Sequence, residues 1–286
     1  MEPEFIASFW TLAGNTHPRD SWVSVLPLET RVEAAAEAGF RGFSFTDTDL
    51  AAVRQSSRWR DYADIRRLLD ANDLRVVELE LIRDWFAMGE RKAASDRIRA
   101  QLFEAAAELG ANHIKILGDF TNQYPVAQMA DGFGEVCNLA ARIGVKIAVE
   151  LTPLTNLFAP QQVIDLVRSS GTRNGGMLLD VWHMGRGGIP FDSLADIPAE
   201  LIIGVELDDA DLEVRGTLME DSMNNRRLCG EGQLEPAKLI AAVQRAGYQG
   251  LYGVEILSDE HRARDVKVAA RVAIESARAQ FPQHPE

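Results

Sequence analysis

The chain has 286 residues, 46% of them hydrophobic, so it suits one large α/β barrel or two modest domains with a sizeable core. Its 43 acidic and 30 basic residues give a net charge of −13, which argues against binding to nucleic-acid phosphates. Two distant cysteines, Cys137 and Cys229, indicate neither a disulfide framework nor a thiolate zinc site, so we expect a cytoplasmic protein. No apolar run reaches the roughly 18 residues that a membrane helix needs, so we expect no membrane partner.

A sequence pattern is repeated along the chain. Alanine-rich segments predict helices that stop at a glycine, the residue favoured at a left-handed helix end, and a short β-prone run follows each of them. These segments are residues 34–39, 105–110, 139–144 and 242–247. After residues 68–71, we expect Asn72 to end the helix in place of a glycine. This pattern is typical of alternating helices and strands.

Eight strands are predicted, separated by helical patterns at spacings of about 30 residues. This number and spacing of strands are those of a (β/α)₈ TIM barrel. They cover residues 6–12, 42–46, 75–81, 113–117, 146–151, 176–180, 201–206 and 251–256. We interpret them as apolar throughout, as in a parallel sheet covered on both faces. A doubly wound open sheet is the competing fold, but no G-x-G-x-x-G motif follows the first strand. We expect a single domain over residues 1–286, with the barrel at about residues 5–280.

One predicted connection is long. About 30 residues, rich in Asp, Glu, Arg and Asn, separate Glu206 from Pro236. Long loops in compact domains are usually functional or disordered. After a seventh barrel strand, this one would overhang the catalytic face.

Four acids end successive apolar runs, at Glu150, Asp180, Glu206 and Glu255. A buried carboxylate is costly unless a cation or a partner is present, and barrels hold their active sites at this end of the strands. The set therefore predicts one shared metal ion, with solvated or structural carboxylates as the alternative. Of Glu78 and Glu80, we expect only Glu80, nearer the carboxyl end of its strand, to reach the site.

Nearly the whole chain resembles the xylose-isomerase-like TIM-barrel superfamily, which includes inosose isomerases, inosose dehydratases and ketose 3-epimerases, and the specific motifs lie in its second half. The motifs that carry the resemblance are Glu-Leu-Thr-Pro at 150–153, Asp-Val-Trp-His at 180–183, Val-Glu-Leu-Asp-Asp at 205–209, Asn-Arg-Arg-Leu-Cys-Gly-Glu-Gly at 225–232 and Gly-Val-Glu at 253–255. Their order is fairly specific for the superfamily. It is a weak guide to any individual activity.

The resemblance implies that Glu150, Asp180 and Glu255 bind one divalent metal, and that Glu150 and Glu255 also exchange the substrate proton. The ketose epimerases usually have a histidine, or sometimes a glutamine, where this sequence has Glu206. A fourth carboxylate makes the site harder and favours Mn²⁺ or Mg²⁺ over zinc, and we expect Mn²⁺, with Mg²⁺ or Co²⁺ as alternatives.

Four further residues are predicted to contact the substrate. The resemblance implies that His183 and Arg226 bind substrate oxygens; a backbone-bonded histidine and a solvated arginine are the alternatives. Glu80 could be a second acid or a hydroxyl-binding group, or form a plain salt bridge. Trp10 could wall the pocket, although core packing would explain it equally well.

The predicted function is that of a metal-dependent isomerase or epimerase that acts on a keto-sugar or keto-inositol through an enediolate. The nearest alternative is a lyase on the same scaffold, an inosose or dehydroshikimate-type dehydratase or an enzyme that cleaves 3-keto-glycosides or C-glycosides. A non-catalytic sugar-binding subunit is less favoured. DNA repair, known on the same barrel with several histidine ligands, fits poorly with five histidines and an acidic chain. We expect a small polyhydroxy ketone or keto-glycoside as partner, no nucleic acid, and do not exclude a homo-oligomer.

Overall fold

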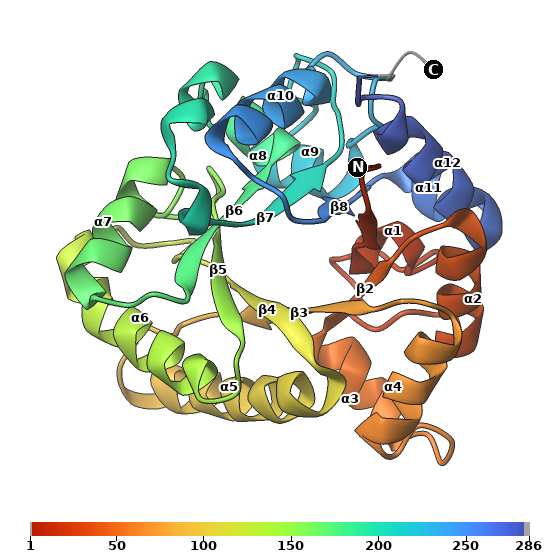
Figure 1. Ribbon diagram of the computed structural model, residues 1–286, viewed down its shortest axis with the longest axis horizontal. Coiled ribbons are helices and arrows are strands. Elements are labelled where there is room, and N and C mark those ends of the chain that lie inside the picture. The colour runs from red at the N-terminus through yellow and green to blue at the C-terminus, as the bar shows by residue number, and fades with distance from the viewer. Residues whose placement is uncertain (1, 283–286) are drawn as a thin grey trace.

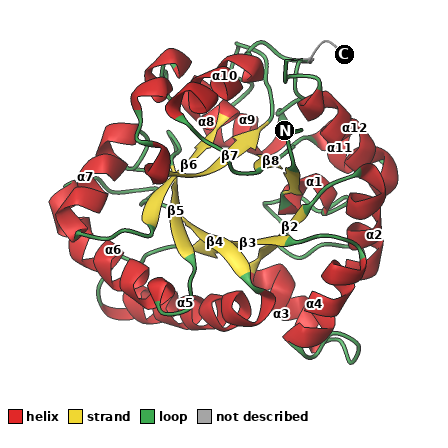
Figure 2. Cartoon of the chain, in the orientation of Figure 1, coloured by secondary structure: helices red, strands yellow, loops and turns green. Residues whose placement is uncertain are grey.

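The computed structural model describes residues 2–282, which form a closed barrel of eight parallel strands inside a ring of helices (Figure 1). Each strand pairs with the next along the chain, and β8 closes the barrel by pairing with β1, where Ile6 faces Gly253. Figure 2 shows the strands as the inner layer and the helices as the outer one. The predicted fold class, a (β/α)₈ TIM barrel, is confirmed.

The strands are β1 Phe5–Ala7, β2 Gly42–Thr46, β3 Val76–Ile82, β4 Ala111–Ile116, β5 Lys146–Glu150, β6 Gly175–Asp180, β7 Ile202–Leu207 and β8 Tyr252–Val254. The helices are α1 Phe9–Leu12, α2 Leu28–Ala38, α3 Asp47–Gln55, α4 Tyr62–Ala71, α5 Gly89–Leu109, α6 Val126–Ala141, α7 Pro160–Ser170, α8 Val181–Arg186, α9 Leu218–Asn224, α10 Pro236–Ala246, α11 Asp259–Arg262 and α12 Val266–Arg278, with short 3₁₀ helices η1 Phe191–Asp196 and η2 Ala199–Leu201. Within residues 2–282, no helix combines the length and the apolar character needed to cross a membrane.

The first strand is shorter than its apolar run predicts. It ends at Ala7, and the chain turns at Ser8 into α1, so the prediction of a strand over 6–12 is wrong. Polar side chains explain the turn: the Ser8 hydroxyl donates to Glu206, and the Thr11 hydroxyl donates to the Val254 carbonyl at 2.7 Å. A short apolar run does not by itself distinguish a strand from a buried helical turn.

The main hydrophobic core lies between the strands and the helices, whereas part of the barrel interior is charged. In β3 and β4 polar residues alternate with apolar ones, so that Glu78, Glu80, His113 and Lys115 all point inward. Residues two apart on a strand share a face. The interpretation of these strands as apolar throughout is therefore wrong. Both glutamates face the interior, but only Glu80 lines the cavity at the carboxyl ends of the strands, as expected, whereas Glu78 lines a cavity at the opposite ends.

Most helix ends follow the predicted pattern, in which the helix stops at a glycine. Gly39 and Gly247 end α2 and α10 with φ of 101° and 98°, in the left-handed region that glycine tolerates. At the end of α4, however, Asn72 has φ of −108°, and Asp73 takes the positive φ of 54° instead. The Asn72 amide donates to the Leu68 carbonyl, so it satisfies the helix end through its side chain rather than its backbone.

Candidate active site

Three of the four predicted metal ligands converge. Glu150 ends β5, Glu206 lies near the end of β7, and Glu255 directly follows β8. Together with β6, which lies between β5 and β7, these strands form one side of the barrel, and their carboxyl ends point the same way (Figure 1). One oxygen from each carboxylate lies within 4.8 Å of the other two, and all three side chains are buried.

The fourth, Asp180, lies beside the group. It ends β6 next to its register partner Glu206. Its Oδ1 accepts a hydrogen bond from the backbone N–H of His183 at 2.7 Å, which caps α8, and its Oδ2 accepts one from Arg226 at 2.9 Å. Both oxygens of Asp180 are therefore engaged by the protein itself.

A buried lysine that the sequence analysis missed lies at the centre of the carboxylates. The Lys115 ammonium, on β4, is 2.5 Å from Glu206 Oε1 and 3.0 Å from Glu78 Oε1. It is also 3.6 Å from Glu80 Oε2 and 3.7 Å from Glu255 Oε1. Lys115 thus connects the inward-facing acids of β3 with those at the ends of β7 and β8.

His183 and Arg226 each contact carboxylates of the site. The His183 ring is 3.0 Å from Glu150 Oε1, so Nε2–H donates to the ionised carboxylate. The Arg226 guanidinium is 2.9 Å from Asp180, 2.9 Å from Asp208 and 3.1 Å from Glu255. Arg226 comes from the long connection after β7, which also contains α9, so this segment supplies a charged group to the mouth of the barrel.

Negative charge is in excess in this part of the molecule. Within residues 2–282, two buried side chains with a full positive charge, Lys115 and Arg226, face seven buried carboxyl groups. The carboxyl groups are Glu78, Glu80, Glu150, Asp180, Glu206, Asp208 and Glu255. Buried carboxylates without compensation are costly, so the interior is suited to a further cation.

The surroundings of these groups separate their affinities for protons. Burial raises the pKa of Glu80 to about 8, with Glu255, Glu78 and Glu150 adding to the effect against Lys115. Burial and the charge of Glu206 raise the pKa of Glu255 well above its usual value. For Glu150, burial is outweighed by its hydrogen bond to His183 and by nearby positive charges, and its pKa is lowered.

Burial opposes the charge on Lys115, but the four surrounding carboxylates outweigh it and raise the pKa of the lysine well above its usual value. The ammonium is therefore a permanent part of the site at neutral pH. For Arg226, likewise, the charges of Asp180, Asp208 and Glu255 outweigh burial and raise the pKa. Both cations are consequently fixed features of the interior.

A cavity of about 330 Å³ opens above these groups. It is lined by all four predicted substrate-binding residues, Trp10, Glu80, His183 and Arg226, together with Glu150 and Glu255. Apolar and aromatic side chains complete its wall, from Trp22, Leu81, Phe120, Leu154, Met219, Met223 and Leu257. The cavity therefore combines a charged floor with an apolar wall, as expected of a small-molecule site.

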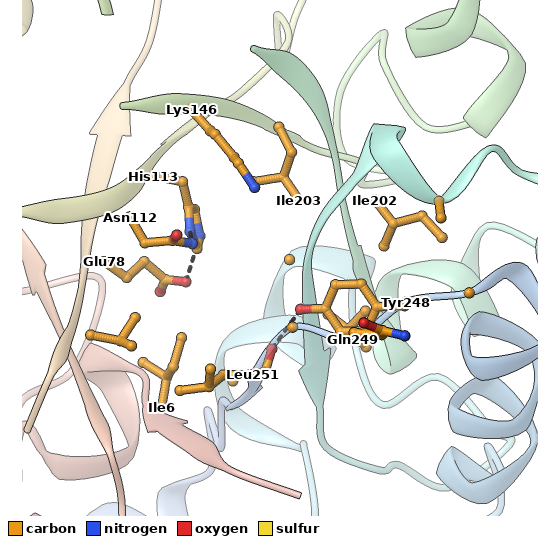
Figure 3. Close-up of a pocket in the computed structure, with 17 residues that line it drawn as sticks. Ile6, Glu78, Asn112, His113, Lys146, Ile202, Ile203, Tyr248, Gln249 and Leu251 are labelled. Carbon is orange, nitrogen blue, oxygen red and sulfur yellow. Dashed lines mark hydrogen bonds and ion pairs between the residues drawn. The ribbon is translucent and has the colours of Figure 1, made fainter. Parts of the chain in front are cut away.

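A second cavity lies at the opposite, amino-terminal ends of the strands (Figure 3). Glu78 and His113 point toward one another there, with Glu78 Oε2 2.8 Å from the ring (Figure 3). Because Glu78 contacts Lys115 through its other oxygen, it lies between this cavity and the carboxylate cluster. His113 is thus at the end of the barrel remote from Glu150 and Glu255.

The carboxylate cluster fits a divalent cation. Three acidic oxygens are close enough together to share one ion, and oxygen-only ligands suit hard cations such as Mg²⁺ and Mn²⁺. Glu206 Oε2 is buried and accepts no hydrogen bond from any residue in the described range 2–282. An unpaired buried carboxylate oxygen is a ligand atom already free of competing hydrogen bonds.

The fold and this site define a class of protein. The model of the family described as xylose isomerase-like TIM barrel matches residues 32–277, and the chain belongs to that family. No single activity follows from membership, because relatives in the family carry different enzyme names.

The chain is 29% identical over 248 residues to a 3-dehydroshikimate dehydratase of Pseudomonas aeruginosa, a match that covers 85% of this chain and 38% of that protein. It is 24% identical over 184 residues to the inosose isomerase of Bacillus subtilis, covering 62% of this chain and 64% of that one. The chain thus spans less than half the length of the dehydratase that it matches.

Solved structures confirm the fold. The structure described as IOLI protein with a binding zinc atom superposes with a TM-score of 0.80 at 17% identity, covering 97% of each chain. A D-allulose 3-epimerase from Methylomonas sp., in complex with D-allulose, gives a TM-score of 0.73 at 17% identity, covering 98% of each chain. At these identities, the structures establish the architecture alone.

Proposed function

We propose that the protein is a divalent-metal-dependent enzyme that removes a proton from the carbon next to a ketone and thereby isomerises or epimerises a keto-sugar or keto-inositol. The observation that carries the proposal is the convergence of Glu150, Glu206 and Glu255 beneath a cavity lined by His183 and Arg226. The names of the relatives, an inosose isomerase and a D-allulose 3-epimerase, support a polyhydroxy ketone as substrate.

Glu150, Glu206 and Glu255 would hold the ion, with Asp180 beside Glu206 as the fourth carboxylate. When bound, a divalent cation would polarise the ketone oxygen and stabilise the negative charge left by proton removal. We propose Mn²⁺, because all four side chains offer hard oxygen atoms.

Glu150 and Glu255 would move the proton. In the metal-free protein, the lowered pKa of Glu150 favours the ionised form that accepts a proton, while the raised pKa of Glu255 favours the form that donates one. Two acids whose surroundings drive their pKa values apart are suited to complementary base and acid roles. Return of the proton to the opposite face of the same carbon gives an epimer, and return to the neighbouring carbon gives an isomer.

Residues along the wall of the cavity would hold the substrate. Arg226 carries N–H groups that can donate to substrate oxygens as negative charge develops, and the His183 ring lines the same wall. Glu80 can hydrogen-bond a hydroxyl, and Trp10 offers an aromatic surface to the C–H face of a sugar or an inositol ring.

Solvent deuterium exchange tests this proposal. In D₂O with Mn²⁺, the enzyme should incorporate deuterium next to the ketone of a keto-inositol or ketose, detected by mass spectrometry. Glu150→Gln should slow incorporation by about a hundredfold or more, because general-base catalysis typically contributes that much. The exposed Glu275→Gln, on α12, should leave the rate unchanged.

Undiminished exchange in Glu150→Gln would exclude Glu150 as the base, and exchange that survives chelation of the metal would exclude the metal. Binding of sugar without exchange into any substrate of this class, unaffected by chelation, would instead identify a non-catalytic sugar-binding subunit.

A dehydratase is the second candidate, favoured by the matches to 3-dehydroshikimate dehydratases and by the chemistry of Glu80. Elimination shares the first proton abstraction but also needs an acid for the departing hydroxyl. With a pKa of about 8, Glu80 is protonated at neutral pH and lines the cavity. A product with a new carbon–carbon double bond, formed from 3-dehydroshikimate or an inosose and detected by its ultraviolet absorbance, would identify this activity.

A further inference from the structure

The two oxygens of Glu206 have different surroundings. Oε1 accepts hydrogen bonds from Ser8 at 2.8 Å and from the Lys115 ammonium at 2.5 Å. Oε2 is buried and, within the part of the chain that the structure describes, has no hydrogen-bond partner. One oxygen of this carboxylate is therefore held by a cation of the protein, and the other oxygen is left without a protein partner.

Lys115 is held firmly in this position. Its side chain is 0% exposed, and it reaches the cluster from β4. Glu78 and Glu80 on β3 hold the ammonium from one side, while Glu206 and Glu255 hold it from the other. With no path to solvent and four acids around it, the ammonium is a fixed positive charge in the floor of the site.

We propose that Glu206 bridges Lys115 and the divalent ion, with Oε1 on the ammonium and Oε2 toward the ion, so that Lys115 sets how tightly the site holds its metal. The inference rests on the proposed metal site. With Glu206 ionised, as a metal ligand must be, the buried Lys115–Glu206 pair contributes no net charge. An ion at the site is then attracted mainly by the remaining carboxylates.

The two members of the pair should therefore affect metal binding in opposite directions. Removal of the ammonium leaves the full charge of Glu206 to attract the ion. Removal of the Glu206 charge leaves the ammonium to repel it. Such interactions are strong at close range in a buried environment, where water screens them poorly. A lysine with a merely structural role would give the other sign, because its loss would disorder the cluster and weaken metal binding.

A double-mutant cycle measures this coupling. Mn²⁺ affinity is measured by isothermal titration calorimetry on the full chain, for wild type, Lys115→Met, Glu206→Gln and the double variant. Lys115→Met should bind Mn²⁺ about tenfold more tightly and Glu206→Gln about tenfold more weakly, as expected for one nearby charge. The double variant should return to within about threefold of wild type, because it restores the net charge.

Lys238→Met is the matched control, because Lys238 lies exposed on α10 in a pair with Glu235 and should not change the affinity. If Lys115→Met does not fold, the comparison of Glu206→Gln with the double variant still decides the matter, because neither protein carries an unneutralised Glu206. Tighter binding in the double variant than in Glu206→Gln supports the bridge.

Two results overturn the inference: a Lys115→Met variant that binds Mn²⁺ no more tightly than wild type, or a double variant as weak as Glu206→Gln. In both cases wild-type binding of Mn²⁺ would leave the proposed function standing. Absence of Mn²⁺ binding by wild type, by contrast, would overturn the proposed function together with the bridge.

Discussion

Glu80 and Glu150 line the same cavity, yet their surroundings give them opposite proton affinities. Glu80 accepts a hydrogen bond from Ser44 at 3.2 Å, and its pKa of about 8 reflects burial among other acids. Glu150 faces His183 and has a lowered pKa. At this scale, the chemistry of each acid depends on its immediate partners, because burial alone would raise the pKa of both.

The raised pKa of Glu80 predicts a pH-dependent stability. The folded protein holds this proton up to about pH 8, whereas a glutamate in the unfolded chain loses it near pH 4.5. Stability should therefore fall as pH rises between these values. Glu80→Gln mimics the protonated form and should remove this loss. In the metal-free protein, we expect equal stability near pH 4 and a variant more stable by roughly 3–5 kcal/mol at pH 9.

Urea unfolding with a chelator present, at a series of pH values, measures this difference. A variant that is no more stable than wild type at pH 9 would show that Glu80 ionises freely in the folded state.

The strand-end acids could be predicted because each follows an apolar run, and three of the four do meet. Lys115 was missed, although alternation in Glu78-Leu-Glu80 and His113-Ile-Lys115 is the signal of inward-facing polar residues. The engagement of Asp180 by Arg226 could not be predicted, since it depends on how the connection after β7 folds back over the barrel.

Among the elements, seven strands were predicted to within two residues at each end, because each contains apolar residues and most follow a recognisable helix end. The first strand was not, since its short length is set by the hydrogen bonds of Ser8 and Thr11 to Glu206 and Val254, which are about 200 residues or more away in the sequence. Local sequence patterns identify elements well where packing agrees with them, and fail where distant polar contacts decide.

A buried ion pair connects two of these elements. Arg31 on α2 donates to Asp49 on α3 at 2.9 Å, and both side chains are 1% exposed. The guanidinium lies 5.9 Å from the ring centroids of Phe9 and Phe43. Arg31→Met should destabilise the protein by about 3 kcal/mol, because it leaves Asp49 charged and buried without its partner.

The double variant Arg31→Met, Asp49→Asn should recover part of this loss in urea unfolding, because no charge remains unpaired. Lys267→Met is the control, since the Lys267–Glu37 pair between α12 and α2 is exposed and should matter little. Equal unfolding midpoints for wild type and Arg31→Met would show that the buried pair does not connect the two helices.

For the whole molecule, barrel closure is what creates the site. Glu150, Glu206 and Glu255 come from three strands spread over more than 100 residues, and parallel pairing brings their ends to one face. Lys115 reaches them across the interior from β4. The architecture was predictable from the repeated helix–strand pattern. The geometry of the ligands was not, because it depends on interior side chains whose positions the pattern does not determine.

The most direct test of the central claim is an anomalous difference map from crystals soaked in Mn²⁺, collected near the manganese absorption edge. The account predicts one peak within coordination distance of Glu150, Glu206 and Glu255 and in contact with Glu206 Oε2. No peak at these carboxylates, or a peak bound elsewhere while Lys115 and Arg226 remain the only cations among them, would contradict it.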